Sequence, residues 1–386
     1  MRFAFLFPRF KILSGAERLL LKLAAALSEA GQDIHILCHQ FDETCRPLLV
    51  EGLHLHVSGV PLDYFRNRYM NAALDYFRNG RLLAALPGEI DAACCFGPAL
   101  TAAAAVKRRS GALVLYFCYE PPRFLYTDRD LILRRLGPVR IPARAFFSAY
   151  LRKDRKMVEA VDRVLSNSEF GRRQIRSAYD RDASVITHGL DPYRQGQRRA
   201  ELRRSLGLSD RDIGVITVNY LHPRKRIELF IETVRAARQK NPAVRGVIVG
   251  EGPERASLQA QAGDAASFAG FVPEDRLYEY FQAGDIYLHT GRLETFGLSV
   301  IEAAGNSLPV VSVNEGGPAE TVADNVSGFL RDSRSEDLAQ AILLLAADPG
   351  LRNSMGKHGY EYVRSRYSWK QGAADFLGAV AGLAPK

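Results

Sequence analysis

Residues 285–313 read DIYLHTGRLETFGLSVIEAAGNSLPVVSV. Two short apolar runs, DIYLH and PVVSV, enclose a segment with helical periodicity, which is the pattern of a βαβ unit with parallel strands. Gly297, just before the helix, permits another group to approach the backbone closely. The stretch therefore predicts an α/β fold in which a strand, a glycine-containing loop and a helix follow one another.

Two carboxylates accompany this loop. Glu294 precedes the expected helix, and Glu302 lies about a turn and a half inside it. The N-terminus of a helix carries unpaired N–H groups and about half a positive charge, so this start suits a diphosphate. Carboxylates would repel a phosphate and suit the neutral hydroxyls of a sugar instead. The alternative is an ordinary helix start with two solvated glutamates.

Apolar runs and helical patterns alternate over almost the whole chain. The expected strands are Phe3–Phe7, Ile34–His39, Leu53–Val57, Ala92–Phe96, Leu113–Tyr119, Val164–Asn167, Ser184–Thr187, Gly214–Asn219, Gly246–Val249, Ser267–Phe271, Asp285–His289 and Pro309–Val313. The expected helices include Ala16–Ala30, Met70–Leu86, Thr101–Arg109, Asp337–Ala346, Gly350–Arg366 and Trp369–Val380. The polar stretch 191–197 contains Pro and Gly and is typical of a linker.

This alternation predicts two doubly wound, Rossmann-like α/β domains of similar size, at 1–190 and 191–365. C-terminal helices are expected to close the structure, with residues 366–386 packing back towards the N-terminal domain. Ligands of doubly wound sheets bind at the carboxyl ends of the strands. We therefore expect a ligand site in a cleft that the two domains face.

The motif at 291–305 also carries a resemblance. The pattern E-x7-E with Phe-Gly inside it, followed by 307–312 and 316–322, resembles the retaining glycosyltransferases of family 4, group 1, which include mannosyltransferases and have the GT-B fold. The similarity continues from 14–18 near the start to 367–369 near the end. It implies an N-terminal acceptor-binding domain and a C-terminal domain that binds a nucleotide sugar.

The resemblance implies roles for the residues of the motif. Glu302 is expected to bind the ribose hydroxyls of the sugar nucleotide, and Glu294 the hydroxyls of the transferred hexose. Backbone N–H groups around Phe296, Gly297 and Leu298 are expected to hold sugar and phosphate. A hydrogen bond to an ionised group contributes roughly 1.5–3 kcal/mol, so loss of either glutamate should cost more than an ordinary surface change.

A second group of residues lies where the strand ending at Asn219 gives way to a helix. Three cations precede that helix, and their charge and position favour a phosphate site, with a solvated helix start as the alternative. The family has an Arg just after the strand and a Lys five residues later, both on the donor diphosphate. Lys225 matches the Lys, but Tyr220 stands where the Arg is expected. Arg224 and Arg226 are the candidates to supply the missing charge.

Small-residue turns at strand ends complete the resemblance in both domains. Gly15 and Ala16 resemble the family's turn beneath the donor phosphates. Gly250, Gly252 and Val272 lie in loops that border the nucleotide in the family. The alternative is that these glycines only make turns.

Tyr119, within YFCYEPPR at 116–123, marks a departure from the family. In mannosyl- and related hexosyltransferases a histidine at this position faces the reacting sugar. A phenol can hydrogen-bond the hexose, but its reference pKa near 10 prevents it from exchanging protons at neutral pH as imidazole does. Of the histidines, His188 is expected to be structural, while His222 and His289 flank the donor site without an assigned role.

The positive charge is concentrated in one segment. The chain has 52 Lys and Arg against 43 Asp and Glu, which gives a net charge of +9. Residues 123–176 contain 14 of the Lys and Arg residues but only 6 of the Asp and Glu residues. Aromatic residues alternate with cations at 145–153, as in a basic amphipathic helix on an anionic membrane. We therefore expect a glycan or lipid-linked acceptor and peripheral membrane contact through 123–176. A solvated cationic face and a soluble anionic acceptor are the alternatives.

Other classes fit less well. The basic segment lacks a zinc pattern, a helix-turn-helix signature and an RNP-like strand, so nucleic acid is not an expected partner. The five cysteines form no C-x-x-C pair, and the apolar run at 3–7 is too brief for a signal peptide. No run reaches the roughly 18 apolar residues of a membrane span. We expect a cytoplasmic protein, peripheral at the inner face of the membrane.

The expected activity is retaining transfer of a hexose, with mannose from GDP-mannose as the best candidate and UDP-glucose or UDP-N-acetylglucosamine as alternatives. Lys225, Arg224 and Glu294 are the expected catalytic residues. No cofactor and no metal are expected. No carboxylate pair is expected to have the Asp-x-Asp form that holds a metal with the diphosphate, so the helix dipole and the cations would neutralise the leaving group. A UDP-sugar 2-epimerase-like enzyme and a non-catalytic sugar-nucleotide-binding partner of a glycosyltransferase are the alternative functions.

Overall fold

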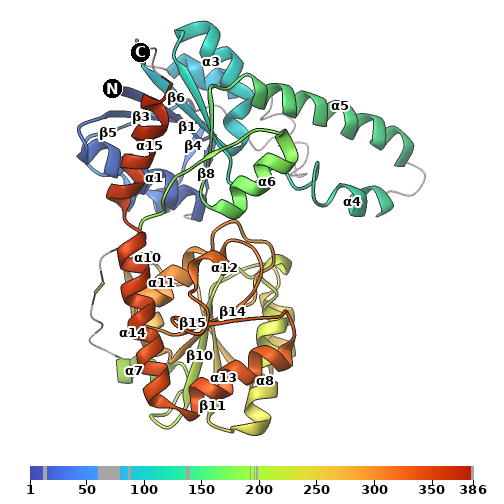
Figure 1. The fold of residues 1–386 in the computed structure, drawn as a ribbon, viewed down its shortest axis with the longest axis vertical. Coiled ribbons are helices and arrows are strands. Elements are labelled where there is room, and N and C mark those ends of the chain that lie inside the picture. The colour runs from blue at the N-terminus through green and yellow to red at the C-terminus, as the bar shows by residue number, and fades with distance from the viewer. Residues whose placement is uncertain are drawn as a thin grey trace. The chain divides into compact units, whose positions relative to one another are not determined.

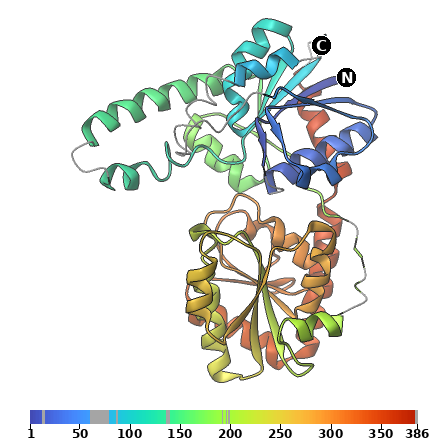
Figure 2. The same ribbon diagram turned by 180° about the vertical axis from the view of Figure 1, so that it is seen from behind.

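The computed structural model describes residues 1–11, 15–59, 79–85, 88–135, 140–191, 193–194, 196 and 199–383. The chain divides into two compact units, one formed by Met1–Gly189 with Trp369–Lys386 and the other by Leu190–Ser368. Both are α/β units in which helices flank a central sheet (Figures 1 and 2). The C-terminal helix thus belongs to the first unit.

The first unit has a seven-stranded parallel sheet in the order β5-β3-β1-β6-β7-β8-β9. Its strands are β1 (Arg2–Leu6), β3 (Asp33–Cys38), β5 (Leu53–Val57), β6 (Ala92–Phe96), β7 (Leu113–Phe117), β8 (Arg163–Ser166) and β9 (Ser184–Val185). A separate pair consists of β2 (Arg9–Phe10) and β4 (Gln40–Phe41). The central strands β1, β6 and β7 of the seven-stranded sheet are nearly all apolar, because helices bury both faces of the sheet.

The helices of this unit are α1 (Gly15–Glu29), α3 (Ala103–Ser110), α4 (Arg129–Arg135), α5 (Arg140–Glu159), α6 (Glu169–Tyr179) and α15 (Trp369–Ala381), with 3-10 turns η1 (Glu43–Leu48), η2 (Asn79–Ala85) and η3 (Gly97–Ala102). Buried side chains of α1 and α15 cover one face of the sheet, and those of α3 and α6 cover the other. Helices α4 and α5 extend away from this sheet (Figures 1 and 2).

The second unit has a six-stranded parallel sheet in the order β12-β11-β10-β13-β14-β15. Its strands are β10 (Ile213–Val218), β11 (Val244–Val249), β12 (Ala266–Gly270), β13 (Ile286–His289), β14 (Val310–Val313) and β15 (Gly328–Arg331). Counted within the unit, the order is 3-2-1-4-5-6. This doubly wound order reverses between β10 and β13, and ligands bind outside the carboxyl ends of the strands at that point.

The helices of the second unit are α7 (Arg199–Ser205), α8 (Ile227–Lys240), α9 (Arg255–Ala262), α10 (Glu274–Ala283), α11 (Leu298–Gly305), α12 (Pro318–Thr321), α13 (Ser335–Ala347) and α14 (Pro349–Arg366), with a 3-10 turn η5 (Pro223–Lys225). Side chains of α8, α9 and α13 form one core layer, and those of α10 and α11 form the other. Because β10 and β13 are adjacent and parallel, the loops that follow them lie beside each other at one edge of the sheet.

Several expected elements differ from the structure. Strand β15 is not among the expected strands, because only two of its four residues, Phe329 and Leu330, are large and apolar. The helix expected at 101–109 is wrong at its start, because residues 101 and 102 belong to η3, which begins at Gly97 with φ of 50°, and α3 begins only at Ala103. The helix expected at 70–86 lies outside the described residues at 70–78 and 86, and its remainder is the 3-10 turn η2. Strand β7 ends at Phe117, before Tyr119.

Among the described residues, every helix is either too short or too polar to cross a lipid bilayer. All five cysteines are buried and free.

Helix α15 is expected to stabilise the first unit through Phe376, which is fully buried with ring centroids 5.5 Å from both Phe3 and Phe5. Phe376→Ala should lower the free energy of unfolding of this unit by about 3–5 kcal/mol. Trp369 is the single tryptophan of the chain and begins α15, so its fluorescence during urea unfolding reports this unit. Lys370→Ala, an exposed change in the same helix, should stay within about 0.5 kcal/mol of wild type. An equal midpoint for both variants would contradict this role.

Candidate active site

Lys225 and Glu294 lie on neighbouring loops of the second unit. Lys225 ends η5 after β10, and Glu294 lies in the loop after β13. The Lys225 Nζ donates to Glu294 Oε1 over 2.7 Å, and the two side chains are 27% and 13% exposed. Because β10 and β13 flank the point where the strand order reverses, this ion pair lies where a doubly wound sheet binds its ligand.

The charges in this pair are strongly coupled. Burial opposes ionisation of Glu294 most strongly of the single causes, but the charge and hydrogen bond of Lys225, together with His289 and Arg224, outweigh it and lower the pKa of Glu294 to about 2. His289, at the end of β13, has its Nε2 3.6 Å from the same carboxylate oxygen. Burial lowers the pKa of His289, so its ring is neutral at pH 7. Neither ring nitrogen has a hydrogen-bond partner in the part of the chain that the structure describes.

Two glycines hold the Glu294 loop in place. The Gly317 N–H donates to the Glu294 carbonyl over 2.7 Å. A Cβ atom at Gly316 would lie 2.5 Å from that carbonyl oxygen, and one at Gly317 would collide with the carbonyl of Thr295. Glycine is therefore required at both positions for the backbone after β14 to approach the loop.

The loop that carries Lys225 is attached to the same structure. The Thr290 hydroxyl donates to the Lys225 carbonyl over 2.9 Å. The Arg292 N–H donates to the Arg224 carbonyl over 2.9 Å. Backbone groups thus fix Lys225 relative to Glu294 independently of their side chains.

The start of α11 lies beside this loop. Gly297 has φ of 85°, and a Cβ atom there would lie 2.7 Å from Pro318 Cγ. The Phe296 ring is buried and packs edge-on against Tyr367, with centroids 5.6 Å apart. Phe296 can therefore offer a ligand only its backbone. Leu298 and Glu302 lie half-buried on α11.

The two arginines considered as replacements for the missing cation differ in their surroundings. Arg226 Nη1 donates to Ser333 Oγ over 2.9 Å and lies 3.8 Å from a Glu315 carboxylate oxygen. Ser333 also donates to that carboxylate. Arg226 thus belongs to a separate network that joins the loops after β14 and β15. Arg224 is not part of this network, so it is the better candidate of the two to supply the charge that is missing at Tyr220.

Tyr220 and the expected nucleotide loops lie on the β11 side of Lys225. Tyr220 is 58% exposed, with its ring 6.4 Å from and nearly parallel to that of His222. A Cβ atom at Gly250 or Gly252 would collide with the carbonyls of the loop after β10. These two glycines therefore let the loops after β10 and β11 pack together. Val272 is half-buried against the core layer of α10 and α11.

The expected donor residues Gly15, Ala16 and Tyr119 lie in the first unit. Gly15 is the first residue of α1, and no atom lies within 4 Å of a Cβ atom built there. Tyr119 Oη donates to the Ala16 carbonyl over 3.0 Å, and its ring packs 5.2 Å from that of Phe117. The phenol proton is thus already used to hold the first turn of α1.

The expectation that the chain has no Asp-x-Asp pair is wrong. Asp-x-Asp sequences do occur in this chain, at 128–130, 180–182 and 210–212. One aspartate of each is engaged elsewhere, Asp128 with Arg123, Asp182 with Arg172, and Asp212 with the backbone N–H of Ser209. None of the three sequences follows β10 or β13.

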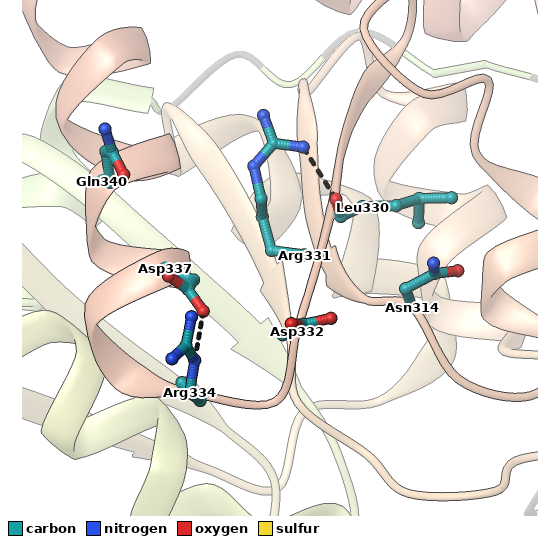
Figure 3. Close-up of a pocket in the computed structure, with 7 residues that line it drawn as sticks. All are labelled: Asn314, Leu330, Arg331, Asp332, Arg334, Asp337 and Gln340. Carbon is teal, nitrogen blue, oxygen red and sulfur yellow. Dashed lines mark hydrogen bonds and ion pairs between the residues drawn. The ribbon is translucent and has the colours of Figure 1, made fainter.

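A separate depression of about 290 Å³ lies beside β15 and the start of α13, lined by Asn314, Leu330, Arg331, Asp332, Arg334, Asp337 and Gln340 (Figure 3). Its cations are paired locally, Arg331 with the Leu330 carbonyl and Arg334 with Asp337. None of the expected site residues lines it.

Sequence reasoning left two features of this region without a role. His289 was noted beside the site but not assigned, although its place at the end of β13 was a signal. The Arg226–Glu315–Ser333 network was not expected, because its three members lie far apart in the sequence.

Two family models match the chain. Residues 198–362 match the model described as glycosyl transferases group 1, and residues 13–194 match glycosyltransferase family 4. The chain is 27% identical over 251 residues to a D-inositol 3-phosphate glycosyltransferase of Kribbella flavida, covering 60% of the chain and 59% of the relative. It is 30% identical over 244 residues to a GDP-mannose-dependent alpha-(1-6)-phosphatidylinositol monomannoside mannosyltransferase of Mycobacterium tuberculosis, covering 58% and 63%. The matched stretches thus span about three fifths of these relatives.

Solved structures share the fold over nearly the whole chain. Sucrose-phosphate synthase of Thermosynechococcus elongatus superposes with a TM-score of 0.76 at 18% identity, covering 99% of this chain and 98% of that one. Anabaena HepE in complex with UDP-glucose gives 0.74 at 19% identity, covering 99% and 100%. These are GT-B proteins, and this chain has their fold. The two family models, which match residues 13–194 and 198–362, show that the chain belongs to the family 4, group 1 glycosyltransferases.

Proposed function

We propose that the protein is a retaining hexosyltransferase that moves a hexose from a nucleoside diphosphate sugar to an acceptor hydroxyl. The observation that carries this proposal is the Lys225–Glu294 ion pair at the reversal point of the second sheet. An ammonium group there suits a diphosphate, and a carboxylate suits sugar hydroxyls. Family membership supports the same division of roles.

In this proposal the leaving group is stabilised by fixed charge. The bond between the sugar C1 and the diphosphate oxygen breaks, and the negative charge on the diphosphate is met by Lys225, Arg224 and the backbone N–H groups at the start of α11. The acceptor oxygen attacks from the face that the diphosphate leaves, so the configuration is retained. A donor phosphate oxygen takes the proton of the acceptor, and no protein base is needed.

The carboxylates hold the donor in position. Glu294, ionised because of Lys225, accepts hydrogen bonds from the hexose, and Glu302 accepts them from the ribose. Before the donor binds, Lys225 and Glu294 neutralise each other. The diphosphate then shares the ammonium group, while the carboxylate turns its second oxygen to the sugar.

The best candidate donor is GDP-mannose. The Pro-Pro-Arg segment after β7 favours mannosyltransferases, and one relative is named as a GDP-mannose-dependent mannosyltransferase. The test is a panel of GDP-mannose, UDP-glucose and UDP-N-acetylglucosamine, with slow hydrolysis measured in the presence and absence of a chelator. GDP-mannose is expected to be hydrolysed fastest, and at the same rate in the presence and absence of the chelator. Epimerisation of UDP-N-acetylglucosamine would favour the 2-epimerase, and no turnover of any donor would favour a non-catalytic partner.

We propose a lipid-linked or membrane-proximal acceptor, bound by the first unit at the inner face of the membrane. The extension formed by α4 and α5 belongs to the basic segment 123–176 and has its own small apolar core of Leu125, Leu133 and Phe147. Phe146 on α5 is 62% exposed, and Phe124 is 42% exposed. Exposed aromatic rings among cations suit the interface of an anionic bilayer.

Loss of the carboxylate at the site should reduce turnover. Glu294→Gln is expected to lower kcat/KM roughly 10–150-fold, the equivalent of one hydrogen bond to an ionised group. Lys225→Ala should lower it at least as much, because the leaving group loses its closest cation. The measurement is initial-rate kinetics with the donor that the panel selects. Glu336→Gln, an exposed glutamate on α13, is the matched control and should keep wild-type kinetics. Wild-type rates in both site variants would contradict the assignment.

The ion pair should also appear in the pH dependence of stability. The pKa of Glu294 is depressed in the folded state, to about 2, so the pair stabilises the fold above the unfolded pKa of about 4.3 and loses this effect as the pH falls towards 2. Lys225→Met leaves the half-buried carboxylate without its partner and should cost about 3 kcal/mol at neutral pH, the equivalent of the pKa shift. The difference from wild type should shrink between pH 4.3 and 2. Urea unfolding followed by circular dichroism measures it, and a pH-independent difference would contradict the pairing.

Membrane contact through α5 can be tested by sedimentation with vesicles that contain anionic phospholipid, at physiological salt. The wild-type protein is expected to sediment, whereas Phe146→Ala combined with Arg152→Glu should remain in the supernatant, since apolar insertion and charge are both lost. Leu344→Ala combined with Lys357→Glu, exposed changes in the second unit, is the matched control. If all three proteins sediment equally, or if the wild-type protein does not sediment with the vesicles, the membrane role is contradicted.

A further inference from the structure

Three histidines and one aspartate gather at the outer edge of the first unit's sheet. Asp33 and His35 lie on β3, and His54 and His56 lie on β5, the edge strand (Figure 1). The parallel register places His35 opposite His54. Because residues two apart in a strand share a face, all four side chains belong to the same face of the sheet.

The atoms that could hold an ion are close together. Asp33 Oδ1 lies 3.1 Å from His35 Nε2 and 3.5 Å from His54 Nε2. The ligand atoms of the three residues all lie within 4.8 Å of one another. Nitrogen and oxygen atoms bound about 2.0–2.1 Å from a tetrahedral ion lie roughly 3.3 Å apart. Only small side-chain movements are therefore needed for these three atoms to share one ion.

Outer contacts orient two of these groups. Arg2 Nε donates to the second oxygen of Asp33, over 2.7 Å, which leaves Oδ1 for the ion. His35 Nδ1 and His56 Nε2 are 2.9 Å apart, which leaves His35 Nε2 for the ion. A ligand histidine whose other ring nitrogen is hydrogen-bonded, beside a carboxylate held by a second group, is the usual outer arrangement of a metal site.

We propose that Asp33, His35 and His54 bind one divalent transition metal ion, such as Zn²⁺. Two imidazoles and one carboxylate are ligands that suit this class of ion, and a water molecule would complete the coordination. The His54 side chain is 56% exposed, so an ion can enter from solvent. The ion would join β3 to the edge strand β5, and Arg2 links it to β1.

The site is separate from sugar transfer. Arg2 and Asp33 are the first residues of β1 and β3, and His54 is the second residue of β5. These are the amino ends of parallel strands, whereas doubly wound sheets bind their substrates at the carboxyl ends. The bound ion is therefore expected to stabilise the first unit and not to take part in the reaction.

The test uses the full chain without a polyhistidine tag, treated with a chelator and then dialysed. At about pH 7.5, where imidazole with a reference pKa of about 6.5 is mostly neutral, the protein is titrated with Zn²⁺ by calorimetry and with Co²⁺ by visible absorption. Wild type is expected to bind one equivalent, to show the d–d bands of tetrahedral Co²⁺, and to gain thermal stability with Zn²⁺.

His54→Ala removes an exposed ligand without disturbing the core and should abolish saturable binding and the thermal shift. His56→Ala should weaken binding roughly 10–100-fold, as loss of an outer contact does. His358→Ala, an exposed histidine on α14, is the matched control and should bind as wild type. Absent binding by wild type would show that the cluster is held by hydrogen bonds alone, and equal binding by His54→Ala would show that the ion binds elsewhere; either result would overturn the proposal. Sugar transfer by His54→Ala, measured in parallel, is expected to be unchanged.

Discussion

The partly buried ion pair between Lys225 and Glu294 sets the requirements for the loops that carry it in the second unit. Removing two charges from water costs several kcal/mol per ion, and the attraction repays this only when both groups are held in good geometry. The structure meets that condition with backbone contacts, since Gly317 holds the Glu294 carbonyl and Thr290 holds that of Lys225. The pair therefore requires glycine at Gly316 and Gly317 after β14, because a side chain at either position would push the loop that carries Glu294 away from Lys225.

Charges that are fixed before a ligand arrives are useful for stabilising a leaving group. A preorganised ammonium group needs no reorganisation when negative charge develops on a diphosphate. The same pairing explains why Glu294 stays ionised in a buried place. Glu315 and Ser333 hold the Arg226 guanidinium in a different network, so Arg224 is the better candidate for the charge that Tyr220 does not supply. Adjacent cations in the sequence thus have different partners, because Lys225 meets the loop after β13 and Arg226 meets those after β14 and β15.

Most of the fold could be predicted from local patterns, whereas side-chain partners could not. Strands such as β6 and the helices α13 to α15 are visible as apolar runs and helical periodicity, and the 285–313 stretch carries the family motif. By contrast, the contact of Tyr119 with Ala16 and the role of Gly250 depend on segments that meet only in the folded sheet. The histidine cluster is hidden for the same reason, because the pairing of His35 with His54 follows from strand register and not from sequence spacing.

Chelator experiments on this protein have two separable readouts if both proposals hold. Metal-independent transfer at the second unit and a stabilising ion in the first unit predict unchanged turnover together with a lower unfolding temperature of the first unit. Trp369 fluorescence follows that unit specifically, because the only tryptophan of the chain begins α15. A loss of turnover in chelator could therefore arise from unfolding or from a metal at the donor. In His54→Ala the structural ion is already absent, so turnover of this variant in chelator reports the chemistry of transfer alone.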